Sequence, residues 1–202
     1  MLQSKEINLY MDKLGAEAKQ ASKVLSQASE EMKNEALMLI SSEIESRRSE
    51  ILEENKKDLE AAKEKSIGSA LIDRLELNDA RIDSMISGLK VVSELPDPIG
   101  EMTDMDPTPS GIKVSKMRVP LGVVGIIYES RPNVTADAAA LCLKSGNACI
   151  LRGGSEAISS NKIIWNCLQK GLELSGLPKE CIQLVETTDR EAVKTLLHLD
   201  SY

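Results

Sequence analysis

The sequence is poor in aromatic residues and has a single histidine. Its 202 residues include no phenylalanine, three tyrosines, one tryptophan and one histidine, His198. Proteins bind single-stranded nucleic acid on aromatic stacking platforms and duplexes on basic faces. With 25 basic and 32 acidic residues, a net charge of −7, the chain is not expected to bind nucleic acid. A lone histidine near the end of a helix offers no catalytic pairing, so we interpret His198 as a surface residue.

Long apolar runs and paired cysteines are also missing. No stretch approaches the roughly 18 apolar residues of a membrane-spanning helix, so no membrane association is expected. The first ten residues lack a basic region followed by an apolar one, so no secretory signal is expected either. The cysteines stand within apolar patterns without a C-x-x-C pair, which predicts buried free thiols in the reducing cytoplasm: Cys142, Cys149, Cys167 and Cys181. No residues have the spacing of metal ligands, so no metal site is expected.

Residues 1–94 are nearly free of glycine and proline, and they are rich in Ala, Leu, Glu and Lys. This composition predicts helices throughout. The polar segment at 45–50 is a candidate break, and Asn78 is a candidate N-cap for a following helix. The apolar face of that helix is expected at Ile82, Met85, Ile86 and Leu89.

Residues 95–119 differ in character from what precedes them. Four prolines between 95 and 110 predict an extended loop. The imperfect alternation of apolar and basic residues at 111–119 predicts an exposed or edge strand, which Pro120 ends.

Residues 120–202 have an alternating α/β pattern. Strands are predicted at 123–128, 148–151 and 181–185, the first as a continuous apolar run buried on both faces. Helices are predicted at 135–144, at 155–174 before Gly176, and at 189–197. The alternation predicts a doubly wound, Rossmann-like parallel sheet. We therefore divide the chain into a helical part (1–94), a loop and edge strand (95–119) and an α/β part (120–202).

The turn after the first of these strands is E-S-R-P-N, residues 129–133. On spacing alone, Asn133 or Thr135 is expected to cap the next helix. Arg131 has two interpretations. Its guanidinium suits an acidic group of a substrate, but it could equally form a structural ion pair with Glu129 or another acid.

The turn after the second strand is L-R-G-G-S-E, residues 151–156. Gly153 and Gly154 permit close backbone approach and positive φ. Ser155 is a candidate N-cap for the long helix, whose amide end favours anions, and Arg152 lies beside it. A tight turn with a surface arginine is the alternative. No G-x-G-x-x-G fingerprint is present, and the glycine pair at 122 and 125 is interpreted as backbone packing inside a strand.

Four segments closely resemble the γ-glutamyl phosphate reductase (glutamate-5-semialdehyde dehydrogenase) family, a branch of the aldehyde dehydrogenase superfamily. They are L-P-D-P-I-G at 95–100, the block at 119–161, G-L-P at 176–178 and Q-L-V-E-T-T-D-R-E-A-V at 183–193. The motif Y-E-S-R-P-N-V at 128–134 favours this branch, since other members of the superfamily carry a tryptophan-containing turn at this position. The resemblance implies NADPH-dependent reduction of L-glutamyl 5-phosphate to L-glutamate 5-semialdehyde, with phosphate release, in cytoplasmic proline biosynthesis.

The resemblance also implies roles for individual residues. Asn133 would donate its amide to the oxyanion formed when a catalytic thiol attacks the carbonyl, a contact typically contributing about 3 kcal/mol. Arg152 would hold the adenosine ribose and favour the 2′-phosphate of NADP. Ser155 or Glu156 would contact the ribose beside Gly153 and Gly154.

In that family the chain continues after this point. The next strand and a glycine-rich turn complete the cofactor site, and a second domain supplies the nucleophilic cysteine that forms the acyl-enzyme thioester. None of the four cysteines here lies on a glycine-rich turn or beside an activating base, so none is assigned that role. The resemblance therefore implies an N-terminal, cofactor-binding half that is inactive alone.

A second hypothesis is a truncated, non-catalytic protein that binds cofactor or pairs with full-length subunits. Residues 111–119 resemble part of the superfamily's oligomerisation hairpin, so a homo-oligomer is expected. The glutamate 5-kinase that makes the substrate is a candidate partner.

Overall fold

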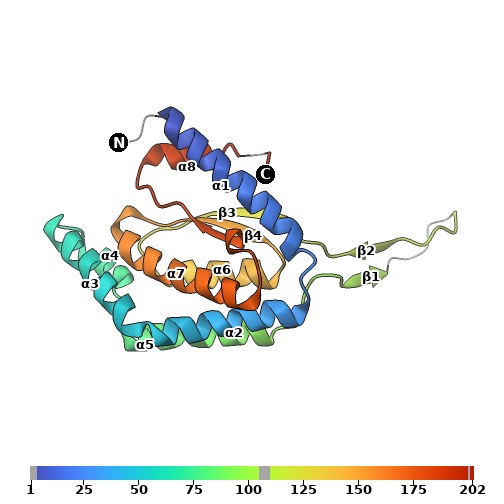
Figure 1. Ribbon diagram of the computed structural model, residues 1–202, viewed down its shortest axis with the longest axis horizontal. Helices are drawn as coiled ribbons and strands as arrows, with labels where there is room; N and C mark the ends of the chain where they lie inside the picture. Colours follow the sequence, from blue (N-terminus) through green and yellow to red (C-terminus); the bar gives the residue numbers. More distant parts are fainter. Residues whose placement is uncertain (1–3, 105–109, 200) are drawn as a thin grey trace.

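The structure is a computed structural model, and it describes residues 4–104, 110–199 and 201–202. A helical N-terminal region and an α/β region form one body, from which a thin hairpin projects (Figure 1). Among the described residues, no helix combines the length and apolar character needed to span a bilayer.

The N-terminal region is helical, as its composition predicts. It forms α1 (Ser4–Leu25), α2 (Glu30–Ser46), α3 (Arg48–Glu64), α4 (Ser69–Leu75) and α5 (Asp79–Glu94). The expected break lies at Arg47, the only residue between α2 and α3. The expected cap of α5 is confirmed, because Oδ1 of Asn78 accepts from the Arg81 N–H at 2.9 Å. The apolar face predicted for α5 is buried.

A parallel sheet occupies the centre of the α/β region. Its strands are β3 (Val123–Ile127), β4 (Ala148–Arg152) and β5 (Ile182–Leu184), in that order. The crossovers are α6 (Val134–Lys144) and α7 (Ile158–Ser175), and α8 (Arg190–Leu196) follows β5. Short 3₁₀ turns, Ser155–Ala157 and Lys179–Cys181, precede α7 and β5. Gly176 ends α7 in the left-handed conformation, with φ 77°.

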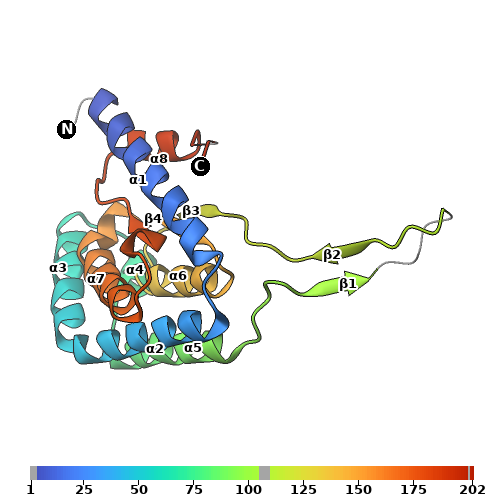
Figure 2. The ribbon, with the colours of Figure 1, turned by 45° about the vertical axis from the view of Figure 1, so that its right-hand side comes forward.

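Helices cover both faces of this sheet (Figures 1 and 2). One face, with Cys149 and Leu151 of β4, packs against α6 and α7, and α2 and α5 pack in turn on these two helices. The other face, with Ala148 and Ile150, packs against α1 and α8. The parallel pairing of the three strands, with a helix between each pair, confirms the predicted α/β architecture. All four cysteines are buried free thiols, as expected.

Two predictions about strands are wrong. The run at 123–128 is not buried on both faces, because β3 is an edge strand and Ile127 is 46% exposed. The predicted loop at 95–110 contains a strand, β1 (Met102–Asp104), which pairs antiparallel with β2 (Ser115–Met117). Strands of three residues are too short for a period-two pattern to reveal them. The part of the predicted loop at 105–109 lies outside the described residues.

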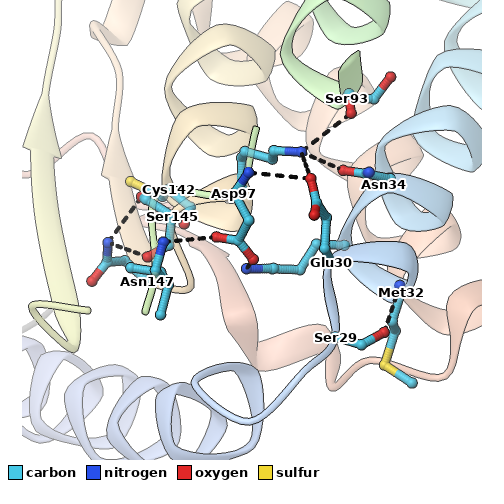
Figure 3. A network of polar contacts seen from close by, with 12 residues as sticks. Ser29, Glu30, Met32, Asn34, Ser93, Asp97, Cys142, Ser145 and Asn147 are labelled. Atoms are coloured by element: carbon cyan, nitrogen blue, oxygen red, sulfur yellow. Dashed lines mark hydrogen bonds and ion pairs between the residues drawn. The ribbon is translucent and has the colours of Figure 1, made fainter. Parts of the chain in front are cut away.

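The β1–β2 hairpin extends away from the body (Figure 2), and every residue of both strands is exposed. A buried polar network fastens its base (Figure 3). Lys33, only 2% exposed, forms an ion pair with Asp97 just before β1. Lys144, only 3% exposed, donates to Asn34 at 2.7 Å and to Glu30 at 3.3 Å. The connection from α5 to β1 is thereby fixed to α2 and α6.

Side chains close the outer edge of β5. Nε1 of Trp165 and Nε2 of Gln169 donate to the carbonyl of Ile182, at 2.9 and 2.6 Å. The Tyr10 hydroxyl donates to the carbonyl of Leu184 and accepts from the Glu186 N–H. These side chains occupy two outer carbonyls of β5, whereas the outer edge of β3 has no strand partner among the described residues.

Candidate functional site

The parallel register brings the ends of the three strands together. Ile127 of β3 is paired with Arg152 of β4, and the Tyr128 N–H donates to the Arg152 carbonyl at 3.0 Å. On the other side, the Val185 N–H donates to Leu151 at 2.8 Å. The turns that follow β3, β4 and β5 therefore meet at one edge, where α/β proteins bind their ligands.

A cavity of about 640 Å³ opens at this edge. The turns after β3 and β4 line it with Glu129, Arg152 and Glu156. The start of α8 contributes Arg190 and Lys194. The volume lies in the usual range of small-molecule pockets, and cations exceed carboxylates among the described lining residues.

Arg152 is buried in the wall of this cavity, so the alternative of a surface arginine is wrong. Its side chain is 9% exposed, and its two Nη atoms donate to the carbonyls of Gly153 and Thr188. Its Nε has no hydrogen-bond partner within the described residues. A buried donor left unpaired costs about 1–3 kcal/mol. This nitrogen is closed to solvent, so an acceptor on a ligand could pair with it only after the side chain moves.

Gly153 of the second turn is needed for space, whereas Gly154 faces only the mobile end of a glutamate side chain. A Cβ on Gly153 would lie 2.2 Å from Nδ2 of Asn161, and one on Gly154 would lie 2.1 Å from Oε1 of Glu156. These close approaches are to side chains of the protein itself, so the approach of a cofactor to this turn stays a prediction. The predicted positive φ is wrong, since neither is among the positive-φ glycines. Glu156 also accepts from the Ser130 hydroxyl at 2.6 Å, which joins the first turn to the second.

Ser155 does not cap the long helix. It begins the 3₁₀ turn, and α7 starts at Ile158 without a cap from the preceding residue. Instead, buried Asp58 of α3 accepts from the N–H groups of Ser159 and Ser160, at 3.2 and 2.8 Å. The amide end of α7 is thus occupied by a carboxylate of the protein, which contradicts the expectation that it favours a ligand anion.

Neither predicted cap of α6 is formed. Asn133 makes no capping hydrogen bond, and its Nδ2 donates to Oδ2 of Asp137 at 2.8 Å. The Thr135 hydroxyl donates to Oδ1 of Asn161 and contacts the Tyr128 hydroxyl at 2.7 Å. An amide nitrogen carries two hydrogens, so Asn133 keeps a second N–H for another acceptor.

A second, smaller cavity of about 290 Å³ lies beside the start of α6. It is lined by Arg131, Asn133 and Asp137, and α4 and α5 contribute Arg74, Arg81 and Ser84. Arg131 is exposed and forms no ion pair in the part of the chain that the structure describes, so the predicted pairing with Glu129 is absent. Burial raises the pKa of Asp137, and the hydrogen bond from Asn133 offsets part of the rise.

The predicted site residues therefore divide between two cavities. Arg152, Gly154, Ser155 and Glu156 line the first, whereas Gly153 is not in its lining and lies against Tyr128. Asn133 and Arg131 line the second. Sequence reasoning missed Arg190 and Asp137. Arg190 follows the end of β5 in the turn T-T-D-R, so the strand-end argument used for the other turns would have indicated it.

Comparison with known protein families identifies the family of this chain. The sequence model of the aldehyde dehydrogenase family matches residues 9–201. The chain belongs to the aldehyde dehydrogenase family.

Solved structures show how similar the chain is to individual enzymes. γ-Glutamyl phosphate reductase from Thermotoga maritima is 41% identical with a TM-score of 0.90, over 95% of this chain and 46% of that one. The Saccharomyces cerevisiae enzyme is 31% identical with a TM-score of 0.83, over 90% and 47%. Methylmalonate-semialdehyde dehydrogenase from Oceanimonas doudoroffii, 18% identical with a TM-score of 0.71 over 96% and 36%, shares the fold. The chain spans about half the length of the two reductases.

Aldehyde dehydrogenases use nicotinamide cofactors, and the first cavity fits one. Its buried Arg152 Nε lacks an acceptor, and its volume and cationic lining suit a phosphorylated nucleotide. Within the described ranges, no group of three or more His, Cys, Asp or Glu is arranged to hold a metal.

The cysteines of this aldehyde dehydrogenase chain lie away from both cavities. Burial raises the pKa of Cys167 to about 11 and that of Cys181 to about 12. The hydrogen bond with Cys142, together with burial, raises the pKa of Cys149. A raised pKa disfavours the thiolate, the nucleophilic form, in these three cysteines. The same hydrogen bond lowers the pKa of Cys142, which lies in α6 away from both cavities.

Proposed function

We propose that this chain is the cofactor-binding half of a γ-glutamyl phosphate reductase. The complete enzyme would reduce L-glutamyl 5-phosphate to L-glutamate 5-semialdehyde with NADPH and release phosphate, in proline biosynthesis in the cytoplasm. The observation that carries the proposal is the cavity at the strand ends, where buried Arg152 keeps an unpaired Nε. The 41% identity to the Thermotoga maritima reductase supports the choice of reaction.

In this proposal, the turn at 152–156 holds the cofactor. The guanidinium of Arg152 contacts the ribose, Gly153 and Gly154 form the turn beside it, and Ser155 and Glu156 contact the sugar. Arg190 and Lys194 add positive charge to the same cavity, which favours NADP with its 2′-phosphate over NAD. The bound cofactor would supply the hydride.

The oxyanion donor in this proposal is Asn133. Its first N–H is fixed by Asp137, so the amide is oriented before substrate binds, and its second N–H is left to donate. Such preorganisation is the source of oxyanion-hole stabilisation, typically about 3 kcal/mol for one donor. The nucleophilic cysteine is not assigned within this chain.

We further propose that the complete enzyme is a homo-oligomer assembled through the β1–β2 hairpin. The hairpin and its flanks expose the apolar side chains of Met102, Ile112, Val114 and Met117. Exposed apolar side chains gathered on a projecting arm indicate a surface that a partner covers. Glutamate 5-kinase is the proposed source of the substrate, and the division at residues 94 and 119 stays a prediction.

Titration of the chain with NADPH tests the cofactor site. Arg152→Ala removes the unpaired donor and should weaken binding about tenfold or more, with NADH binding less well than NADPH to the unaltered chain. Arg118→Ala is the matched control, because Arg118 is an exposed arginine on the hairpin, paired with Glu101. Equal affinity of the Arg152 variant and the unaltered chain would remove Arg152 from the site, and no binding by any variant would count against a cofactor site in this chain.

A further inference from the structure

The smaller cavity holds charges of both signs that the protein leaves unpaired. Arg81 is already paired within the protein, because it donates to the carbonyl of Glu76 and forms an ion pair with Asp73 at 3.1 Å. Arg131 has no ion pair among the described residues, and neither do Arg74 and Glu76 of the same lining. Asp137 accepts from the amide of Asn133 but has no cationic partner among the described residues.

An unpaired carboxylate in a half-buried position is costly for the protein. Burial raises the pKa of Asp137, since the charged form is disfavoured where water is excluded and no cation compensates. A carboxylate needed only for structure would be better replaced by asparagine, which accepts the same bond from Asn133. The cost is offset if a cation from outside the protein binds there.

The chemistry of a fitting ligand follows from these two groups. Asp137 can accept from an ammonium, and the fork of Arg131 can donate to a carboxylate through two parallel hydrogen bonds. A single molecule that carries both charges close together is an α-amino acid. Asn133 touches Asp137 and is also the proposed oxyanion donor, so it links this end of the cavity to the reacting acyl group.

We propose that this cavity binds the backbone of an amino-acid substrate, with Asp137 accepting from its α-ammonium and Arg131 donating to its α-carboxylate. The inference rests on the proposed function and deepens it by naming the residues that distinguish an amino acid from other acyl compounds. It adds Asp137 as a residue that determines substrate specificity.

The test is titration of the ¹⁵N-labelled chain, followed by NMR at the side-chain N–H signals of Asn133 and Arg131. L-Glutamate should shift both signals. Glutarate, which lacks the ammonium, and 4-aminobutyrate, which lacks the α-carboxylate, should each bind about tenfold more weakly or worse. Asp137→Asn should reduce L-glutamate binding to the level of glutarate, and Arg131→Ala, at an exposed position, should reduce it to that of 4-aminobutyrate.

Glu76→Gln is the matched control, because it removes the same charge from an exposed residue that lines the same cavity. It should change L-glutamate affinity by less than about twofold. The proposal is overturned by an equal loss in the Glu76 variant, by unchanged binding in the Asp137 variant, by glutarate binding as tightly as glutamate, or by no shift with L-glutamate.

NADPH titration of the same samples separates this inference from the proposed function. Asp137→Asn should leave NADPH affinity unchanged, because Asp137 does not line the cofactor cavity. Failure of the glutamate titration with intact NADPH binding would refute only the amino-acid site. Loss of NADPH binding in the unaltered chain would count against the proposed function itself.

Discussion

Asp137 is a carboxylate that the fold holds at the expense of stability. Because burial raises its pKa, the folded chain binds this proton more tightly than the unfolded chain does. The free energy of unfolding should therefore be larger below the ordinary pKa of a carboxyl group and fall as pH rises through the raised pKa. Asp137→Asn should raise the free energy of unfolding near neutral pH and flatten this dependence, as measured by urea denaturation across the acidic range. Destabilisation of the Asn variant at neutral pH would contradict this account of Asp137.

The ion pair of Lys33 and Asp97 has the opposite effect on the pH dependence of stability. Burial alone would raise the pKa of Asp97, but the hydrogen bonds from Lys33 and from the Ile99 N–H lower it. The pair therefore stabilises the fold above the ordinary carboxyl pKa, and this contribution is lost as pH falls through the lowered value.

Asp97→Ala should cost about 3–5 kcal/mol of unfolding free energy, because Lys33 would be left charged and buried. The double replacement Lys33→Met with Asp97→Leu should recover most of the loss. Urea denaturation measures both, with Glu101→Ala on the exposed Arg118 pair as the control, expected to change stability by less than about 1 kcal/mol. If Asp97→Ala lowered the unfolding free energy no more than the control does, the stabilising role of the buried pair would be contradicted.

Residue-level predictions from sequence succeeded where the partner is close along the chain. Asn78 caps α5 through a residue three positions later, so the local pattern was sufficient. Ser155 failed as a cap because Asp58, far away in the sequence, takes the amide end of α7. Asp137 has no local signal, because an aspartate within an alanine-rich helix is ordinarily solvated.

At the scale of elements, α2 and α7 pack so closely that one glycine decides their separation. A Cβ on Gly171 would lie 2.4 Å from Cγ1 and 2.8 Å from the backbone nitrogen of Ile40. Gly88 in α5 provides the contrast, since its Cβ would meet only Oδ1 of Asp137 at 3.8 Å, an ordinary contact.

The two glycine-to-alanine variants should change stability in opposite directions. Gly171→Ala should cost about 1–3 kcal/mol, because the backbone of Ile40 must move. Gly88→Ala should gain up to about 1 kcal/mol from helix propensity. Thermal or urea unfolding distinguishes them, and stabilisation by alanine at both positions would show that the close approach of α2 and α7 is not needed.

The elements themselves were largely predictable, whereas their pairing was not. Helices and buried strands follow from composition and periodicity, and most bounds differ by one or two residues. The exposure of β3 and the existence of β1 depend on which strands pair, and that is set by contacts between distant residues. The apolar run at 123–128 is the same whether its outer edge is paired or open.

At the scale of the whole molecule, the two cavities that hold the predicted site residues lie on one body. A hairpin projects from this body (Figure 2). The family could be inferred from sequence because the turns at 129–133 and 151–156 carry distinctive sequence motifs. The residues of these turns are divided between two cavities, and this division depends on how the turns are arranged around the sheet edge in three dimensions. The proposed roles follow this division, with cofactor at the strand ends and substrate beside α6.

The most direct test of the central claim is amide hydrogen exchange of the chain with and without NADPH, read by mass spectrometry. The account predicts slower exchange with NADPH in peptides covering 127–130, 152–156 and 188–194, the turns that line the larger cavity, and no change in the β1–β2 hairpin. Protection confined to other regions, or no protection at saturating NADPH, would contradict a cofactor site at the ends of β3, β4 and β5.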